Sequence, residues 1–551
     1  MIIPEIPLAQ SILQLFKAKN IQHIIISPGS RNAPLTIGFA SDPFFKCYSI
    51  ADERSAAFFA MGIAQQLQQP TAVICTSGSA VLNFYPAVAE AFYSQIPLIV
   101  VSADRPANKI DIGDGQTIRQ VNVLTNHTVF NANLSEKANQ DNDQLIQKAI
   151  QSAIDLKGPV HINVPFEEPL YQTQSNYSYL PEIIPEQQEK SREIISEEMV
   201  LKWQKATKKL VLVGVQDPDE LSKETIDFLA NDPSVLVMTE ITSNLHHPNF
   251  IEHIDTLITS FEEQDFKDFQ PDLLITIGGM VVSKRIKALL RNYPAAQHWH
   301  IDALRAYNTF GYLTHHIKAT PEVFFTAVSK ESSENAGYQS KYTTILRQKT
   351  KKQTAYLQQT SFSDLKVFEL LSQSVPAKSQ LHISNSAGIR YAMLFPFHPD
   401  ISVFCNRGTS GIDGCTSTAV GAATTSLETT TLITGDVSFF YDSNALWNNY
   451  IPNNFKIIII NNGGGGIFRI LPGHQENAVF NTYFETEHQL TAQYLATMYG
   501  LDYVSANKEE ETIEALKKIY SENNRPVILE IFTPTKENQN IQKEYFKNLE
   551  L

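Results

Sequence analysis

Short apolar runs alternate with segments of helical pattern along almost the whole chain of 551 residues. In the first third, the apolar runs lie at 22–27, 46–51, 71–77, 97–103 and 159–165. Alanine-rich or amphipathic segments separate them, such as those at 54–67 and 80–94. Strands that alternate with helices form βαβ units, so this pattern predicts parallel sheets with helices on both faces.

The same alternation occurs twice more along the chain. In the middle third the apolar runs lie at 209–214, 234–240, 272–279 and 297–302. In the last third they lie at 381–386, 401–406, 430–436, 455–462 and 526–532. Polar stretches near 171–198 and 330–360 separate the blocks, and the first has the composition of a linker. Because the chain is too long for one core, we expect three doubly wound parallel-sheet α/β domains, at 1–180, 190–335 and 355–551.

The composition is that of an ordinary soluble globular protein, with 43% hydrophobic and 19% charged residues. The sequence contains no run of about 18 apolar residues, so we expect no transmembrane helix and no membrane partner. A net charge of −14 disfavours nucleic-acid binding. The cysteines show no C-x-x-C spacing and are expected to be reduced thiols in a cytoplasmic protein; they are Cys47, Cys75, Cys405 and Cys415.

Polar residues follow two neighbouring apolar runs in the last third. Gly435 and Asp436 end one run, Asn462 ends the next, and four glycines follow at 463–466. Ligands of open parallel sheets bind beyond the carboxyl ends of the strands. Carboxylate and amide oxygens are ligands that Mg²⁺ prefers, and glycine N–H groups can cradle a diphosphate. The pattern therefore predicts a metal–diphosphate site, although both sequences are also common in ordinary turns.

This pattern resembles the thiamine-diphosphate binding motif, which begins G-D-G and ends N-N; here Val437 stands at the third position. Enzymes that use this cofactor also need a carboxyl group that hydrogen-bonds a nitrogen of its aminopyrimidine ring. The candidate is Glu53, which follows the run at 46–51 and opens an alanine-rich helix. An acidic residue at a helix N-terminus can equally be there only to complement the helix dipole.

Stretches in all three blocks resemble one family, the MenD or 2-succinyl-5-enolpyruvyl-6-hydroxy-3-cyclohexene-1-carboxylate (SEPHCHC) synthases of menaquinone biosynthesis. Besides the GD…NN pattern they are ISPGSRNAPL (26–35), DERSAAFFAMG (52–62), TSGSAVLNFYPAVAEA (76–91), SADRP (102–106), NRGTSGIDG (406–414) and GGIFRILP (465–472). The resemblance implies a thiamine-diphosphate enzyme fold, with pyrimidine-binding, central and diphosphate-binding domains in that order. It also implies a transferase that decarboxylates 2-oxoglutarate and adds the succinyl carbanion equivalent to isochorismate.

The resemblance implies a cofactor site for thiamine diphosphate and Mg²⁺ (or Mn²⁺). Glu53 is the implied catalytic residue, and Asp436, Asn462 and the Gly464 carbonyl are the implied metal ligands. Ile412 is the implied wedge that holds the cofactor bent. The full implied set of cofactor contacts is Glu53, Ile412, Gly435, Asp436, Asn462, Gly464, Ile467 and Phe468.

Both implied substrates are dicarboxylates, which an acidic protein must hold with local clusters of Arg and Lys. Basic residues follow five of the predicted strands, where a ligand-binding face would need them. For any one of them, a solvated surface side chain is the ordinary alternative. The resemblance implies that Ser30, Arg31, Arg105, Gln116 and Lys284 contact isochorismate, with Arg285 paired to Lys284. It implies that Ser386, Arg390 and Arg407 contact the part derived from 2-oxoglutarate, and that Phe468 and Leu471 form apolar walls.

The family places the glutamate of one subunit against the metal site of another, so the resemblance implies a homodimer or homotetramer. Two other functions remain open on the residues. Another thiamine-diphosphate 2-oxoacid decarboxylase or acetolactate synthase-like carboligase would share Glu53 and Asp436 but need fewer cations. A non-catalytic phosphate-binding protein could use the four glycines alone.

Overall fold

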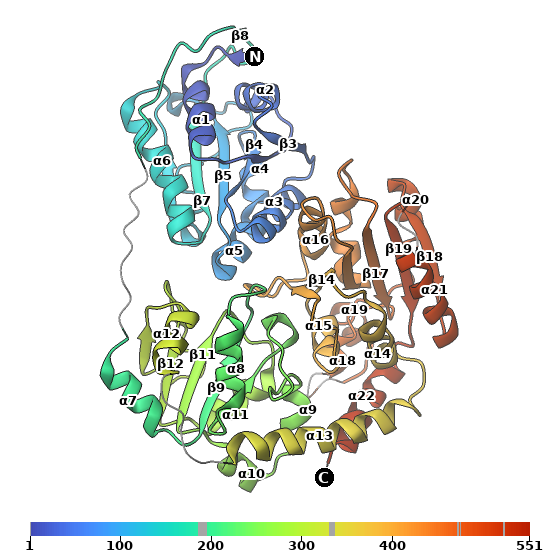
Figure 1. Cartoon of the computed structure of the whole chain (residues 1–551). Coiled ribbons are helices and arrows are strands. Elements are labelled where there is room, and N and C mark those ends of the chain that lie inside the picture. Colours follow the sequence, from blue (N-terminus) through green and yellow to red (C-terminus); the bar gives the residue numbers. More distant parts are fainter. Residues whose placement is uncertain are drawn as a thin grey trace.

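The computed structural model describes residues 2–185, 195–329, 337–470, 473, 475–521 and 524–550. Three parallel sheets stand apart in Figure 1, each covered by helices that follow its strands. Adjacent strand residues face opposite cores: Ile24 and Ile26 pack in one cluster, and Ile25 packs in another. The prediction of three doubly wound α/β units is therefore confirmed, whereas their boundaries stay a prediction. Part of the expected linker, 186–194, lies outside the described residues.

The first sheet has the order β3-β2-β4-β5-β7-β6, with all neighbours parallel. Its strands are β2 (His23–Ile26), β3 (Lys46–Ser49), β4 (Thr71–Cys75), β5 (Leu98–Asp104), β6 (Phe130–Asn133) and β7 (Val160–Pro165). Its helices are α1 (Pro7–Ala18), α2 (Ala33–Ser41), α3 (Glu53–Leu67), α4 (Ala80–Asn83), α5 (Tyr85–Ser94), α6 (Gln140–Asp155), η1 (Ala107–Lys109) and η2 (Thr125–His127). A short antiparallel pair joins β1 (Ile3–Pro4) to β8 (Thr173–Gln174).

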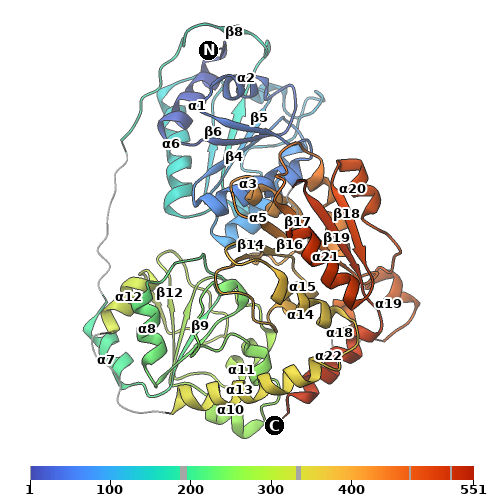
Figure 2. The ribbon, with the colours of Figure 1, turned by 45° about the vertical axis from the view of Figure 1, so that its right-hand side comes forward.

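The middle sheet has the order β10-β9-β11-β12-β13. Its strands are β9 (Lys209–Val213), β10 (Val235–Met238), β11 (Leu273–Ile277), β12 (Gln297–Ile301) and β13 (His315–Ile317). Its helices are α7 (Glu197–Lys205), α8 (Lys223–Asn231), η3 (Ile241–Ser243), α9 (Ile254–Ile258), α10 (Glu263–Phe269), α11 (Lys284–Asn292) and α12 (Pro321–Val328). The long helix α13 (Tyr338–Leu357) then runs beneath this sheet toward the last one, as both views show (Figures 1 and 2).

The last sheet has the order β15-β14-β16-β17-β19-β18. Its strands are β14 (Gln380–Ile383), β15 (Ser402–Phe404), β16 (Thr430–Gly435), β17 (Phe455–Asn461), β18 (Asp502–Ala506) and β19 (Val527–Phe532). Its helices are α14 (Asp364–Ser374), α15 (Ala387–Ala392), α16 (Cys415–Ala423), α17 (Asp436–Tyr441), η4 (Ser443–Leu446), α18 (Ile467–Ile470), α19 (Ala478–Tyr483), α20 (Gln493–Tyr499), α21 (Glu509–Ser521) and α22 (Glu537–Asn548).

The first and last sheets meet where α3 crosses α16. A Cβ added to Gly62 of α3 would lie 2.1 Å from the carbonyl oxygen of Thr418, and one added to Gly421 of α16 would lie 2.1 Å from that of Phe59. Glycine on both helices thus allows the two backbones to touch. Among the described residues, no helix combines the length and the apolar character needed to span a bilayer.

Candidate functional site

A cavity of about 330 Å³ lies beyond the carboxyl ends of β14, β16 and β17. Gly435 at the end of β16 is in register with Ile460 of the parallel strand β17. The residues that follow these positions, Asp436 and Asn462, therefore come out at the same edge of the sheet, and both line the cavity. This is where the sequence places them, and where open α/β sheets bind ligands.

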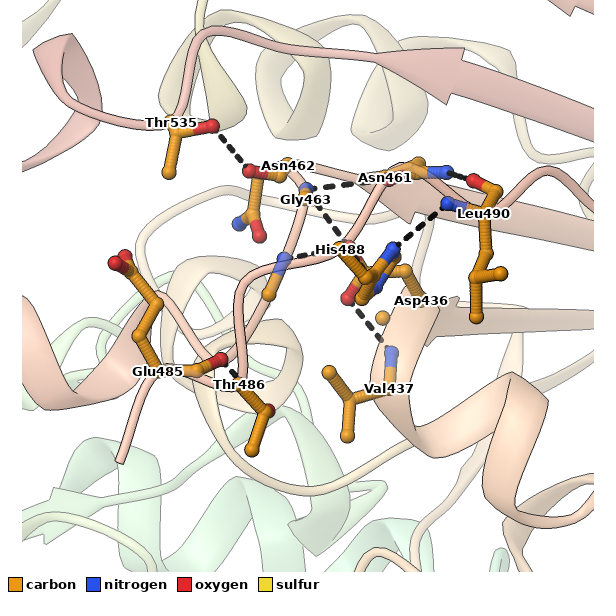
Figure 3. A network of polar contacts seen from close by, with 12 residues as sticks. Asp436, Val437, Asn461, Asn462, Gly463, Glu485, Thr486, His488, Leu490 and Thr535 are labelled. Atoms are coloured by element: carbon orange, nitrogen blue, oxygen red, sulfur yellow. Dashed lines mark hydrogen bonds and ion pairs between the residues drawn. The ribbon is translucent and has the colours of Figure 1, made fainter. Parts of the chain in front are cut away.

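Asp436 opens helix α17 and is buried. Its Oδ2 atom accepts hydrogen bonds from the backbone N–H groups of Gly463 at 2.9 Å and Gly464 at 3.0 Å. His488 Nε2 lies 3.4 Å from the same oxygen, and the carboxylate raises the pKa of this histidine (Figure 3). The side chain thus joins the end of β16 to the glycine loop after β17.

Asn462 presents an unpaired oxygen to the cavity. Its Nδ2 donates to Asp364 Oδ2 at 2.9 Å. Its backbone oxygen accepts from Thr535 Oγ1 at 2.5 Å (Figure 3). Its Oδ1 atom is buried and has no hydrogen-bond partner. A buried amide oxygen without a donor is a ready ligand for a hard cation such as Mg²⁺.

The glycine loop packs closely against the backbone of Glu485 and lines the cavity. Gly464 has φ +154°, and a Cβ there would lie 2.7 Å from the backbone oxygen of Glu485. The Gly464 carbonyl accepts the N–H of Gly466 at 3.0 Å. Asp436, Asn462 and Gly464 thus all line one cavity, and their carboxylate, amide and carbonyl oxygens are the types of ligand that a divalent cation such as Mg²⁺ takes. In the described part of the chain, no group of three or more His, Cys, Asp and Glu side chains offers an alternative metal centre.

Apolar side chains also line the cavity. Ile412, Ile467 and Phe468 line it, and the backbone oxygen of Ile412 accepts from Ser438 Oγ at 2.7 Å. The predicted cofactor contacts of the last sheet therefore face one space. Leu471, the other predicted wall residue, lies outside the described residues.

Glu53 does not line this cavity, and neither do the other described residues of the first sheet. It is the first residue of α3, where Asp52 caps the helix by accepting from the backbone N–H of Arg54 at 2.9 Å. The side chain of Arg54 donates to the backbone oxygen of Tyr441, at the far end of α17 from Asp436. Within one chain, Glu53 is thus not among the residues that line the cavity of the predicted metal ligands.

Four predicted substrate residues gather at the carboxyl edge of the first sheet. Ser30 and Arg31 follow β2, and the N–H of Arg31 donates to Thr76 Oγ1 after β4. The Arg31 guanidinium is buried and bonds the backbone oxygen of Phe166 and the carboxylate of Glu168, each at 3.0 Å.

Arg105 follows β5 and lies at the same edge of the sheet as Ser30 and Arg31. Its Nε donates to the backbone oxygen of Gly115 at 2.9 Å, next to exposed Gln116. The backbone of Gln116 lies 3.3 Å from the position of a Cβ added to Gly78, in the turn after β4. The structure thus brings together Ser30, Arg31, Arg105 and Gln116.

The other predicted cations lie between the middle and last sheets. Arg407 is buried, donates to Asn385 Oδ1 at 2.6 Å, and has an unpaired Nε. Arg390 donates to the backbone oxygen of Ser386, and burial, followed by the charge of Arg407, lowers its pKa. Asn385 and Ser386 both line the cavity, whereas their partners Arg407 and Arg390 do not. Arg407 lines a second cavity of about 210 Å³.

Lys284 and Arg285 open helix α11 and are exposed. The Arg285 guanidinium lies 4.5 Å from the ring centroid of Phe546 in α22, and its Nε lies 4.0 Å from Asp255. Arg285 is thus already engaged in packing, whereas Lys284 is open to solvent.

Two buried carboxylates at the site were not among the predicted residues. Asp364 of α14 bonds Asn462, and burial raises its pKa to about 6. Glu90 of α5 bonds the loop that carries Arg407. The only signal in the sequence for Asp364 is Ser363 before it, which indicates a helix start.

Family models of thiamine pyrophosphate enzymes match most of the chain. The N-terminal TPP binding domain matches residues 6–126, the middle domain 174–383 and the C-terminal TPP binding domain 388–531.

Curated relatives match over the full length. The 2-succinyl-5-enolpyruvyl-6-hydroxy-3-cyclohexene-1-carboxylate synthases of Flavobacterium psychrophilum and Flavobacterium johnsoniae are each 60% identical and cover 100% of both chains. That of Christiangramia forsetii is 49% identical over 98% of each chain. A solved structure, the thiamine diphosphate-dependent 4-hydroxybenzoylformate decarboxylase of Rhodococcus jostii RHA1, superposes with a TM-score of 0.68 at 16% identity. It covers 96% of this chain and 99% of its own, and it supports the fold alone.

Proposed function

The chain belongs to the SEPHCHC synthase (MenD) family of thiamine-diphosphate enzymes, and from this premise we propose that it decarboxylates 2-oxoglutarate and transfers the succinyl portion to isochorismate. The products are SEPHCHC and CO₂, and the protein is a transferase of menaquinone biosynthesis. The observation that carries the proposal is the buried, unpaired Oδ1 of Asn462, which faces the same cavity as Asp436.

In this proposal, Asp436, Asn462 and the Gly464 carbonyl hold Mg²⁺ or Mn²⁺, and the glycine loop holds the diphosphate. Thiamine diphosphate, when bound, supplies the nucleophilic carbon and the electron sink that decarboxylation needs. Ile412, Ile467 and Phe468 enclose the reacting groups and exclude water, which protects a carbanion from simple protonation.

Glu53 acts from a second copy of the chain in this proposal, and holds a proton at its carboxyl group for a ring nitrogen of the cofactor. Two observations support a homodimer, or a homotetramer built from dimers. The cavity has no lining residue from the first sheet within one chain. Large aromatic side chains of the last domain are exposed: Tyr441, Trp447, Tyr483 and Tyr494. A second copy that covers them would bring its own Glu53 to the cavity.

In this proposal, separate sets of residues bind the two substrates. Ser386 lines the cavity, Arg390 and Arg407 bond its lining residues Ser386 and Asn385, and the three bind the 2-oxoglutarate carboxylates. Ser30, Arg31, Arg105 and Gln116, with Lys284 and Arg285, bind isochorismate. The buried guanidinium of Arg407 is desolvated and has an unpaired Nε, so it can bind a carboxylate strongly.

We also infer a cytoplasmic enzyme with pyrimidine-binding, central and diphosphate-binding domains at 1–180, 190–335 and 355–551. All four cysteines are free thiols, and burial raises their pKa values, which fits a reducing compartment.

The test is incubation with 2-oxoglutarate, isochorismate, thiamine diphosphate and Mg²⁺, followed by measurement of isochorismate loss and product mass. We expect a succinylated product that depends on all four components. The absence of that product would overturn the assignment. Turnover of pyruvate comparable to that of 2-oxoglutarate would favour the rival 2-oxoacid decarboxylase or acetolactate synthase-like function.

A further inference from the structure

The orientation of the Asn462 amide is fixed by one neighbour. Its Nδ2 lies 2.9 Å from Asp364 Oδ2. A carboxylate accepts hydrogen bonds and an amide oxygen has no proton to donate, so only the NH₂ group can face Asp364. The opposite end of the amide, Oδ1, must then face the cavity, where it is buried without a partner.

The reversed amide would be unfavourable in two places. Its oxygen would lie against the Asp364 carboxylate, where two acceptors repel each other. Its NH₂ group would face the cavity and Asp436, where it would offer protons to the position of a cation. Asp364 therefore selects the one orientation in which Asn462 can bind a metal ion.

Asp364 is itself held in place. Its Oδ1 accepts from Thr533 Oγ1 at 2.6 Å, and its backbone N–H donates to Asn538 Oδ1 at 2.9 Å. Its side chain is 3% exposed and lies at the start of α14. The contacts come from the residue that follows β19 and from α22, and neither carries a predicted metal ligand. The aspartate is thus a rigid support rather than a flexible surface acid.

We propose that Asp364 is a positioning residue for the metal site: it fixes the Asn462 amide with its oxygen toward the cation and acts through that orientation. This inference rests on the proposed metal site at Asp436, Asn462 and Gly464. Removing such a support behind a metal ligand typically weakens metal binding about 10- to 100-fold.

The experiment compares three variants of the full-length protein by their Mn²⁺ dissociation constants, read from the electron paramagnetic resonance signal of free Mn²⁺ in the presence of thiamine diphosphate. Asp364→Ala leaves the Asn462 NH₂ group without its acceptor, and we expect the dissociation constant to rise about 10-fold or more. Asp364→Asn can still accept from Asn462 Nδ2 with its oxygen and donate to Thr533 with its own NH₂. We expect it to restore binding to within about threefold of wild type.

Asp143→Ala is the matched control. Asp143 is a buried carboxylate on α6, beside the first sheet, that bonds Ser11 and Tyr179 and does not line the cavity. It controls for the loss of a buried, hydrogen-bonded acid, and we expect wild-type Mn²⁺ affinity. Circular dichroism reports whether each variant is folded.

The outcomes separate this inference from the proposed function. Wild-type protein that binds no Mn²⁺ with thiamine diphosphate would overturn the proposed metal site. If wild type binds but folded Asp364→Ala binds equally well, Asp364 does not position the ligand. If Asp364→Asn binds as poorly as Asp364→Ala, the carboxylate acts through its charge, and the orientation argument is wrong.

Discussion

Glu90 of α5 accepts two hydrogen bonds from Thr409, one from its backbone N–H at 2.6 Å and one from its hydroxyl at 2.7 Å. The backbone N–H of Gly408 donates to the other carboxylate oxygen at 2.7 Å. A buried acid beside the first sheet thus holds the loop after β15. That loop carries Arg407 and leads to Ile412, so its shape decides where both side chains lie.

Glu90→Ala should destabilise the protein and displace this loop. The backbone N–H groups of Gly408 and Thr409 would lose their acceptor in a partly buried place, and two lost hydrogen bonds of about 1 kcal/mol each should lower the free energy of unfolding by about 2 kcal/mol. We also expect a higher KM for 2-oxoglutarate, because Arg407 would no longer be held. Chemical denaturation and steady-state kinetics measure the two effects.

Ser94→Ala is the control for Glu90, because it removes one donor to the same carboxylate and leaves the loop contacts intact. It should cost less than about 1 kcal/mol and leave the KM unchanged. An unchanged KM in Glu90→Ala would show that the loop keeps its shape without the acid.

Gly421→Ala should separate α3 from α16. The added Cβ would lie 2.1 Å from the backbone oxygen of Phe59, and a backbone cannot move aside as a flexible side chain can. We expect a loss of about 3 kcal/mol or more in the free energy of unfolding. Gly337→Ala is the control, since the nearest atom to its added Cβ is Ser340 Oγ at 3.4 Å, and it should change stability by about 0.5 kcal/mol at most. Equal unfolding midpoints for the two variants would contradict the close helix contact.

The sequence predicted the central strands but missed β6, β13 and β18. Each of these three is one of the two outer strands of its sheet, whereas the opposite outer strands β3, β10 and β15 were predicted. An outer strand is buried less completely, and residues such as Asn131, His315 and Asp502 break its apolar pattern. Inner strands such as β17 are buried on both faces and therefore appear as continuous apolar runs.

The sequence likewise indicated some residues of the candidate site and missed others. Asp436 and Asn462 could be found because each follows an inner strand, and a parallel sheet brings such positions together. Asp364 and Glu90 lie on helices, and their partners are 98 and 318 residues away in the sequence. No local pattern encodes those pairings, since they exist only after the domains have packed.

Asp442 should make stability fall as pH rises. Burial raises its pKa to about 7, above the ordinary value of 3.8, so the folded state holds a proton that the unfolded state has lost. Its contribution to stability is complete below about pH 4 and is lost as pH rises to about 7. Asp442→Asn keeps both contacts with Ser417, because its oxygen can accept the N–H and its NH₂ can donate to the hydroxyl. The stability of this variant relative to wild type should therefore increase between pH 4 and pH 8, by about 2–4 kcal/mol. Parallel pH profiles from urea denaturation would contradict the raised pKa.

Glu53→Gln and Asp436→Ala should each be nearly inactive, because one removes the proposed proton-holding group and the other a proposed metal ligand. The loss for Glu53→Gln should be about 100-fold or more in kcat, while thiamine diphosphate still binds.

If Glu53 of one copy serves the cavity of another, unfolding and refolding the two variants together should restore activity. Each mixed dimer then contains one site with both native residues, so a random mixture should recover roughly a quarter of wild-type activity. Refolding each variant alone is the control and should recover none. A mixture as inactive as its components would mean that Glu53 and Asp436 act within one chain.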